Sequence, residues 1–160
     1  MTTHMKARRG RVEDYRLTTG QGSFTDDMAV EGALWAVFVR SPYGAATIHG
    51  IDVAEAQAMP GVVAIYTAAD LAQDGVAPAQ AEMSLTGPDG RVWEHTERPL
   101  LANGEARFVG EPLAMVIAET REAAMDAAEA VLPNLTDHPA IVTLADARVK
   151  DARCVHDNRP

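Results

Sequence analysis

Short apolar runs alternate with turn-forming residues along most of the chain. The run 34–40 is apolar at adjacent as well as alternate positions, which predicts a strand buried on both faces. Segments 45–51 and 62–67 predict two further strands. Because residues 41–44 (Ser-Pro-Tyr-Gly) form a break between the first two runs, we expect those two strands to pair as a hairpin.

Helix signals lie between and after these runs. A short helix is expected over 53–59 with Asp52 as its N-cap, and Thr67 opens another helical turn. Thr120 caps the clearest helix, expected over 121–132. The apolar stripe expected to face the core consists of Ala124, Met125, Ala128, Val131 and Leu132.

Glycine and proline mark the remaining bends. A long loop is expected over 72–98, with a strand fragment at 91–95. Residues 106–119 predict a strand that bends at 110–112 (Gly-Glu-Pro), and 140–144 predict the last strand. Since the helices are few and short, the pattern indicates an α+β fold: a mixed β-sheet with two or three short helices.

The first 32 residues differ from the rest, because they have charges and turn formers but no hydrophobic period. We expect three parts: an extended N-terminal arm over 1–32, a globular domain over 33–147 that contains the long loop, and a C-terminal tail over 148–160.

Composition and charge narrow the class of protein. The chain has 160 residues, 47% of them apolar, which suits one globular domain. Its net charge of -9 argues against nucleic-acid or anionic-membrane binding, although residues 1–16 carry a net +3. The chain has no run of 18 apolar residues and no secretion signal, so a cytoplasmic location is expected.

Candidate chemistry is sparse. Gly20 and Gly22 form a G-x-G, but position 25 is Thr and neither a strand before nor a helix after is predicted, so turns are favoured over a phosphate cradle. The single cysteine, Cys154, excludes an internal disulfide or a multi-cysteine cluster. None of the histidines has metal-ligand spacing; they are His4, His49, His95, His138 and His156.

Glu111 is the only carboxylate set inside an apolar run. It could act as a general base with a raised pKa, or it could cap a turn or pair with Arg107; the structural role is favoured. No self-contained active site emerges, and we assign no catalytic, cofactor-binding or metal-binding residue.

Four segments together resemble, in order and spacing, the opening of the large molybdenum subunit of the xanthine dehydrogenase and aldehyde oxidase family. The carbon monoxide dehydrogenase-like branch is the most similar, and the resemblance covers roughly residues 8–147. The segments are RVEDYRLTTGQGSFTDDM (11–28), FVRSPYGAATI (38–48), PGVVAIYTAADL (60–71) and RFVGEPLAMVIAET (107–120).

The resemblance implies an α/β-hammerhead domain within a molybdenum-dependent hydroxylase or dehydrogenase. In such an enzyme molybdopterin holds the molybdenum, and iron–sulfur clusters and FAD lie on partner chains or domains. The motifs that bind the pterin or supply catalysis in the family are absent here, so the chain alone is expected to bind no cofactor. One departure is Pro133, which stands where the family begins a strand, so the pairing of 133–145 is open.

Three functions are therefore compared. The leading hypothesis is a hammerhead domain or split subunit that scaffolds the molybdopterin-binding domains, with iron–sulfur and flavin subunits as further partners and self-association possible. The alternative is a non-enzymatic binding or assembly module that retains the fold. A freestanding hydrolase or isomerase using Glu111 or His138 has little support.

Overall fold

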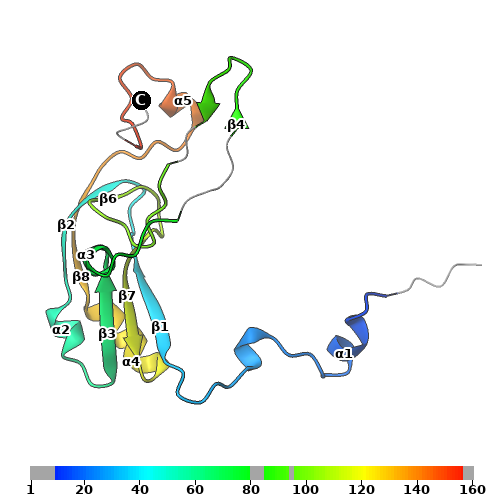
Figure 1. The fold of residues 1–160 in the computed structure, drawn as a ribbon. Coiled ribbons are helices and arrows are strands. Elements are labelled where there is room, and N and C mark those ends of the chain that lie inside the picture. The colour runs from blue at the N-terminus through cyan, green and yellow to red at the C-terminus, as the bar shows by residue number, and fades with distance from the viewer. Residues whose placement is uncertain (1–9, 80–84, 94–95, 157–160) are drawn as a thin grey trace, which may run out of the picture. The chain divides into compact units, whose positions relative to one another are not determined.

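The computed structural model describes residues 10–79, 85–93 and 96–156, and the chain divides into two compact units, Met1–Ala33 and Leu34–Pro160 (Figure 1). Each unit is considered by itself.

The described part of the first unit has no core of its own. It contains the helix α1 (Asp14–Thr18) and a 3-10 turn, η1 (Thr25–Asp27), which interrupt the segment expected to form an extended arm. The Asp14 carboxylate accepts a 2.8 Å hydrogen bond from the Arg11 N–H and so holds the start of α1. None of the residues 10–33 is buried. The large apolar side chains left exposed are Val12, Tyr15, Leu17, Phe24, Met28 and Val30.

The second unit contains two three-stranded sheets and a small hairpin. One sheet has the order β1-β7-β3 and the other β6-β2-β8. Every strand pair among the described residues is antiparallel, where a mixed sheet was expected. The strands of the sheets are β1 (Trp35–Arg40), β2 (Ala46–Asp52), β3 (Val62–Thr67), β6 (Glu105–Ala106), β7 (Pro112–Ala118) and β8 (Leu132–Asp137).

The predicted hairpin between the first two strands is wrong, because β1 and β2 lie in different sheets. β1 pairs with β7, starting from Trp35 opposite Ala118, whereas β2 pairs with β6 and β8. The Ser41 N–H donates to the Glu111 carbonyl at 2.9 Å, so the break after β1 is bonded to the start of β7 and carries the chain across to the second sheet.

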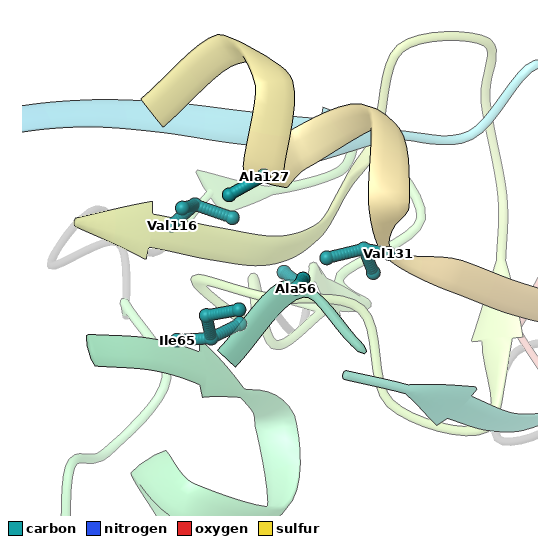
Figure 2. Packing of buried hydrophobic residues seen from close by; sticks show 6 residues of the cluster. Ala56, Ile65, Val116, Ala127 and Val131 are labelled. Carbon is teal, nitrogen blue, oxygen red and sulfur yellow. The ribbon is translucent and has the colours of Figure 1, made fainter. Parts of the chain in front are cut away.

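Helices cover one face of the first sheet. α4 (Arg121–Ala130) and α2 (Ala54–Gln57) pack there, and Figure 2 shows Ala127 and Ala56 next to Val116 of β7 and Ile65 of β3. The Thr120 cap is confirmed, since its hydroxyl oxygen accepts a 3.1 Å hydrogen bond from the Ala123 N–H.

The predicted stripe of α4 is only partly right. Ala124 and Val131 are buried and Ala128 is half-buried, but Met125 and Leu132 are exposed and Ala127 is buried instead. Leu132 is exposed because the chain has already left the helix there and entered β8.

Within the described residues of the second unit, no such layer of helices packs on the opposite face of the first sheet. Residues paired directly across an antiparallel sheet share a face. The register therefore places Phe38 of β1 with Met115 of β7 and Tyr66 of β3, and Ala36 with Ile117 and Ala64. Phe38 is 41% exposed and its neighbours on this face are at least partly exposed, so β1 is not buried on both faces as predicted.

The region after α4 also differs from the prediction. The last strand among the described residues is β8, not 140–144, and Pro133 lies within it opposite Ile51. β8 is an edge strand, the place in a sheet where proline is tolerated, because one side of such a strand has no neighbour to bond. Segment 140–144 is not a strand, since the Thr143 hydroxyl oxygen accepts from the Asp146 N–H at 3.1 Å and caps a helical turn, α5 (Leu144–Ala147).

The other elements agree more closely with the prediction. α3 (Ala68–Gln73) starts at the Thr67 capping box, and the Asp52 carboxylate accepts from the Ala54 N–H at 3.0 Å at the start of α2, although Val53 occupies the N-cap position. The long loop holds the hairpin of β4 (Leu85–Thr86) and β5 (Val92–Trp93), and residues 94–95 of the expected fragment lie outside the described residues. The α+β class is confirmed.

Candidate functional site

The titratable candidates do not gather into an active site. Within residues 10–79, 85–93 and 96–156, no three His, Cys, Asp or Glu side chains lie close enough together to hold a metal ion. His4 and His95 lie outside the described residues. Cys154 is a free thiol, half-buried in the C-terminal segment.

Two of the histidines are held by threonines across the second sheet. His138 Nε2 lies 2.8 Å from Thr47 Oγ1, and His49 Nε2 lies 2.8 Å from Thr136 Oγ1. Thr47 and Thr136 are directly paired between β2 and β8, so the four side chains form a polar ladder on one face. This arrangement favours a packing role for His138 over a catalytic one.

The G-x-G of the first unit does not have the surroundings of a nucleotide site. Gly20 has a φ of +73°, so its turn does need glycine, but Gly22 lies outside the left-handed region. α1, not a strand, precedes the pair, so the dinucleotide fingerprint is excluded.

Among the residues that the structure describes, Glu111 is one of two buried polar side chains, and it is only 5% exposed; the other is Ser41. Its Oε2 accepts a short hydrogen bond from the Arg107 backbone N–H. The carboxylate therefore caps the turn over 107–111, which confirms the structural role. Arg107 does not pair with it through the guanidinium, which donates to the Val155 carbonyl at 3.2 Å and the Glu105 carbonyl at 3.4 Å.

The turn over 107–111 is bonded on both sides. Gly110 adopts a φ of +86°, its N–H donates to the Ser41 carbonyl at 2.8 Å, and its carbonyl accepts from Arg40 Nη1 at 2.8 Å. At the tip, Phe108 is 56% exposed and Val109 is 68% exposed. We call this segment the Phe108 turn. The sequence predicted the bend at 110–112 but not that Ser41 bonds to it. The one sequence feature that points to Ser41 is its position in a Ser-Pro break after an apolar strand.

A cavity of about 450 Å³ lies beside the Phe108 turn. We call it the Glu111 cavity. Its wall is apolar at Pro99, Pro112, Phe108 and Val155. Polar side chains line the rest, namely Thr96, Glu97, Arg98, Arg107, Glu111 and His156. Val155 and His156 come from the C-terminal segment, which an Arg153–Glu105 ion pair of 2.7 Å also fastens to β6.

This arrangement can bind but offers little chemistry. The cavity holds a buried carboxylate whose one oxygen already accepts a backbone hydrogen bond, and no hydroxyl or thiol nucleophile lies among its lining residues apart from the threonine Thr96. The two carboxyls whose pKa is shifted, Asp70 and Asp146, both cap helices and do not line the cavity.

Comparison with known proteins matches residues 19–133 to the family model described as the aldehyde oxidase and xanthine dehydrogenase a/b hammerhead domain. The large subunit of nicotine 6-hydroxylase from Paenarthrobacter nicotinovorans is 45% identical over 121 residues, which are 76% of this chain and 14% of that protein.

Solved structures give the same picture. Quinoline 2-oxidoreductase from Pseudomonas putida 86 matches with a TM-score of 0.79 and 38% identity, over 89% of this chain and 17% of that chain. A Cu,Mo-CO dehydrogenase matches with a TM-score of 0.76 and 33% identity, over 98% of this chain and 18% of that chain. The chain thus spans less than a fifth of the length of these proteins. No helix among the described residues is long and apolar enough to cross a membrane.

Proposed function

The chain belongs to the aldehyde oxidase and xanthine dehydrogenase family and has its hammerhead fold, and we propose that it serves as a scaffold for the molybdenum-binding part of a hydroxylase or dehydrogenase without catalytic residues of its own. The observation that supports this most is the share of each chain matched: nearly all of this chain corresponds to 18% of a Cu,Mo-CO dehydrogenase chain. In this proposal residues 33–147 form the hammerhead domain, 1–32 an arm and 148–160 a connecting tail.

The residues of this chain do not fit the cofactors of such an enzyme. An iron–sulfur cluster needs several thiolates, and the chain has only one cysteine. The Glu111 cavity contains one buried carboxylate and no set of ligands for a metal. In this proposal the molybdenum centre belongs to other domains of the large subunit, and the iron–sulfur and flavin groups belong to partner chains or domains. A cytoplasmic location stays a prediction.

The scaffold role can be tested by replacing the corresponding segment of a related enzyme with this chain. In the large subunit of nicotine 6-hydroxylase, the stretch that matches this chain is replaced by this chain, and the molybdenum content of the purified chimera is measured. A scaffold of the same fold should preserve most of the molybdenum of the parent subunit. A chimera that is folded by circular dichroism but retains no molybdenum would contradict the scaffold role.

The isolated chain provides the complementary measurement. It is expected to contain no stoichiometric molybdenum, iron or flavin by elemental analysis and absorbance, because the ligand set is missing. A flavin spectrum or one metal per chain would contradict this. The alternative of a non-enzymatic assembly module has no specific observation in its favour.

A further inference from the structure

The Phe108 turn holds two large apolar side chains in water. Exposure of this kind is unremarkable in a loose loop, but this turn is fastened by hydrogen bonds to Arg40 and Ser41 and by the Glu111 carboxylate. The backbone that carries Phe108 and Val109 is therefore held in one conformation. A backbone that is fixed before binding loses less conformational entropy on binding, which favours affinity.

The buried polar side chains of the described residues, Glu111 and Ser41, both hold this turn in place. Glu111 caps the turn from within, and the Ser41 backbone bonds to Gly110 and Glu111 while the Ser41 hydroxyl bonds to the backbone of Tyr43. Burying a carboxylate is costly unless its hydrogen bonds compensate. A chain that needed only a loop here could use an apolar or exposed residue, so the position of Glu111 indicates that the shape of the turn matters.

The surroundings of the turn indicate what covers it. Phe108 and Glu111 line the same cavity as Val155 and His156, and Arg107 bonds to the Val155 carbonyl. The described C-terminal segment therefore lies along this cavity. In the relatives, more than four fifths of the chain lies outside the matched stretch.

We propose that the Phe108 turn and the Glu111 cavity together form the seat of the molybdenum-binding remainder of the large subunit, with apolar side chains of that remainder covering Phe108 and Val109. Glu111 is a positioning residue in this assignment, since it acts through the turn. The inference rests on the proposed scaffold function and adds to it the place of contact.

The test uses the chimera described above and hydrogen exchange. The Val109 N–H donates no hydrogen bond to any described residue, so in the isolated chain it should exchange rapidly. In the chimera its exchange should be slowed at least tenfold, because the remainder covers the turn. A molybdenum-containing chimera with unchanged exchange at Val109 would overturn the seat and leave the scaffold function standing, whereas a chimera without molybdenum would contradict the scaffold function itself.

Substitutions give the second measurement. The pair Phe108→Ala and Val109→Ala should reduce the molybdenum content of the chimera at least threefold, while the isolated chain unfolds at nearly the same temperature, since both side chains are exposed. The matched control is Val63→Ala with Met125→Ala, two exposed apolar side chains elsewhere. Equal losses from both pairs would contradict the assignment.

Two variants test whether the turn depends on the hydrogen-bond acceptor at Glu111. Glu111→Gln keeps an oxygen that accepts the Arg107 N–H, so the chimera should keep its molybdenum and its slow exchange at Val109. Glu111→Ala removes the acceptor, and the exchange at Val109 in the chimera should rise at least fivefold above that of the Gln variant. Identical exchange in both variants would show that the turn does not depend on Glu111.

Discussion

Arg40 and Gly110 are joined across 70 residues of sequence by a 2.8 Å hydrogen bond from the arginine Nη1 to the glycine carbonyl. The same guanidinium lies 5.3 Å from the centre of the Phe38 ring. The bond depends on the left-handed backbone of Gly110, which orients its carbonyl toward Arg40 while its N–H meets the Ser41 carbonyl. One backbone conformation thus links β1 to the entrance of β7.

Gly110→Ala should therefore lower the free energy of unfolding by about 1 kcal/mol or more, because a φ of +86° strains any residue with a Cβ. Gly50→Ala is the matched control: Gly50 is outside the left-handed region and a Cβ there meets no atom within 4 Å. Urea denaturation measures the free energy of unfolding of both variants. Equal stabilities would show that the turn relaxes without cost.

Leu113→Ala should cost about 2–5 kcal/mol of unfolding free energy, because the Leu113 side chain is fully buried against Ala46, Ala102 and Ala106 and its removal leaves a cavity. The control Leu144→Ala truncates an exposed leucine and should change stability by no more than about 0.5 kcal/mol. Thermal and urea melts measure both. A loss below about 1 kcal/mol at Leu113 would contradict this, since it would mean that Ala46, Ala102 and Ala106 close over the space.

Asp70 should make stability depend on pH in the acid range. Its pKa is held below the usual 3.8 mainly by the Thr67 hydroxyl, which donates at 2.6 Å, and then by the Thr67 N–H at 2.7 Å. A lowered folded-state pKa gives stability that is present above pH 3.8 and is lost as the pH falls through the folded value.

Asp70→Asn should consequently be less stable than the parent chain at neutral pH, and the difference should shrink as the pH drops below 3.8. The control is Asp126→Asn, because the Asp126 carboxylate forms no hydrogen bond with the described residues. Urea midpoints between pH 6 and pH 2.5 give the comparison. A difference that stays constant over this range would contradict the linkage.

The face of the first sheet that carries Phe38 should cause self-association of the isolated chain. Phe38 lies there with Tyr66, Met115 and Ile117, no helix of the described second unit packs on this face, and apolar side chains of this kind favour contact with another copy. Phe38→Ser should raise the monomer fraction in light scattering at both low and high salt, since apolar contacts are not screened. Val142→Ser, which changes a valine that is 80% exposed, should leave the fraction unchanged. A parent chain that is monodisperse at both salts would exclude this surface as an association site.

Local signals predicted the elements that local chemistry determines. Thr120 and Thr67 cap helices where expected, because a threonine followed by free N–H groups needs no distant partner. The bend at Gly110 was likewise visible from the Gly-Glu-Pro sequence.

The sequence did not reveal which strands pair with each other. The Ser41–Gly44 break is typical of a hairpin turn, yet β1 pairs with β7, and the break is bonded to Gly110 and Glu111 at the start of that strand. Val142 and Thr143 have strand propensity, but the Thr143–Asp146 cap outweighs it. The burial of Glu111 was suggested by its apolar neighbours, whereas the cavity beside it depends on Val155, which no local pattern connects to position 111.

The position of β7 at the centre of its sheet sets the order of events on the ribosome. β1 and β3 both pair with β7, so neither has a neighbour in that sheet until residue 118 has been made. At about 5–20 residues per second, the roughly 78 residues after Arg40 take on the order of 4–16 s to synthesise. During that interval the nascent segment Trp-Ala-Val-Phe-Val-Arg has no strand paired to either edge. A holding chaperone would bind such a segment until β7 has been synthesised.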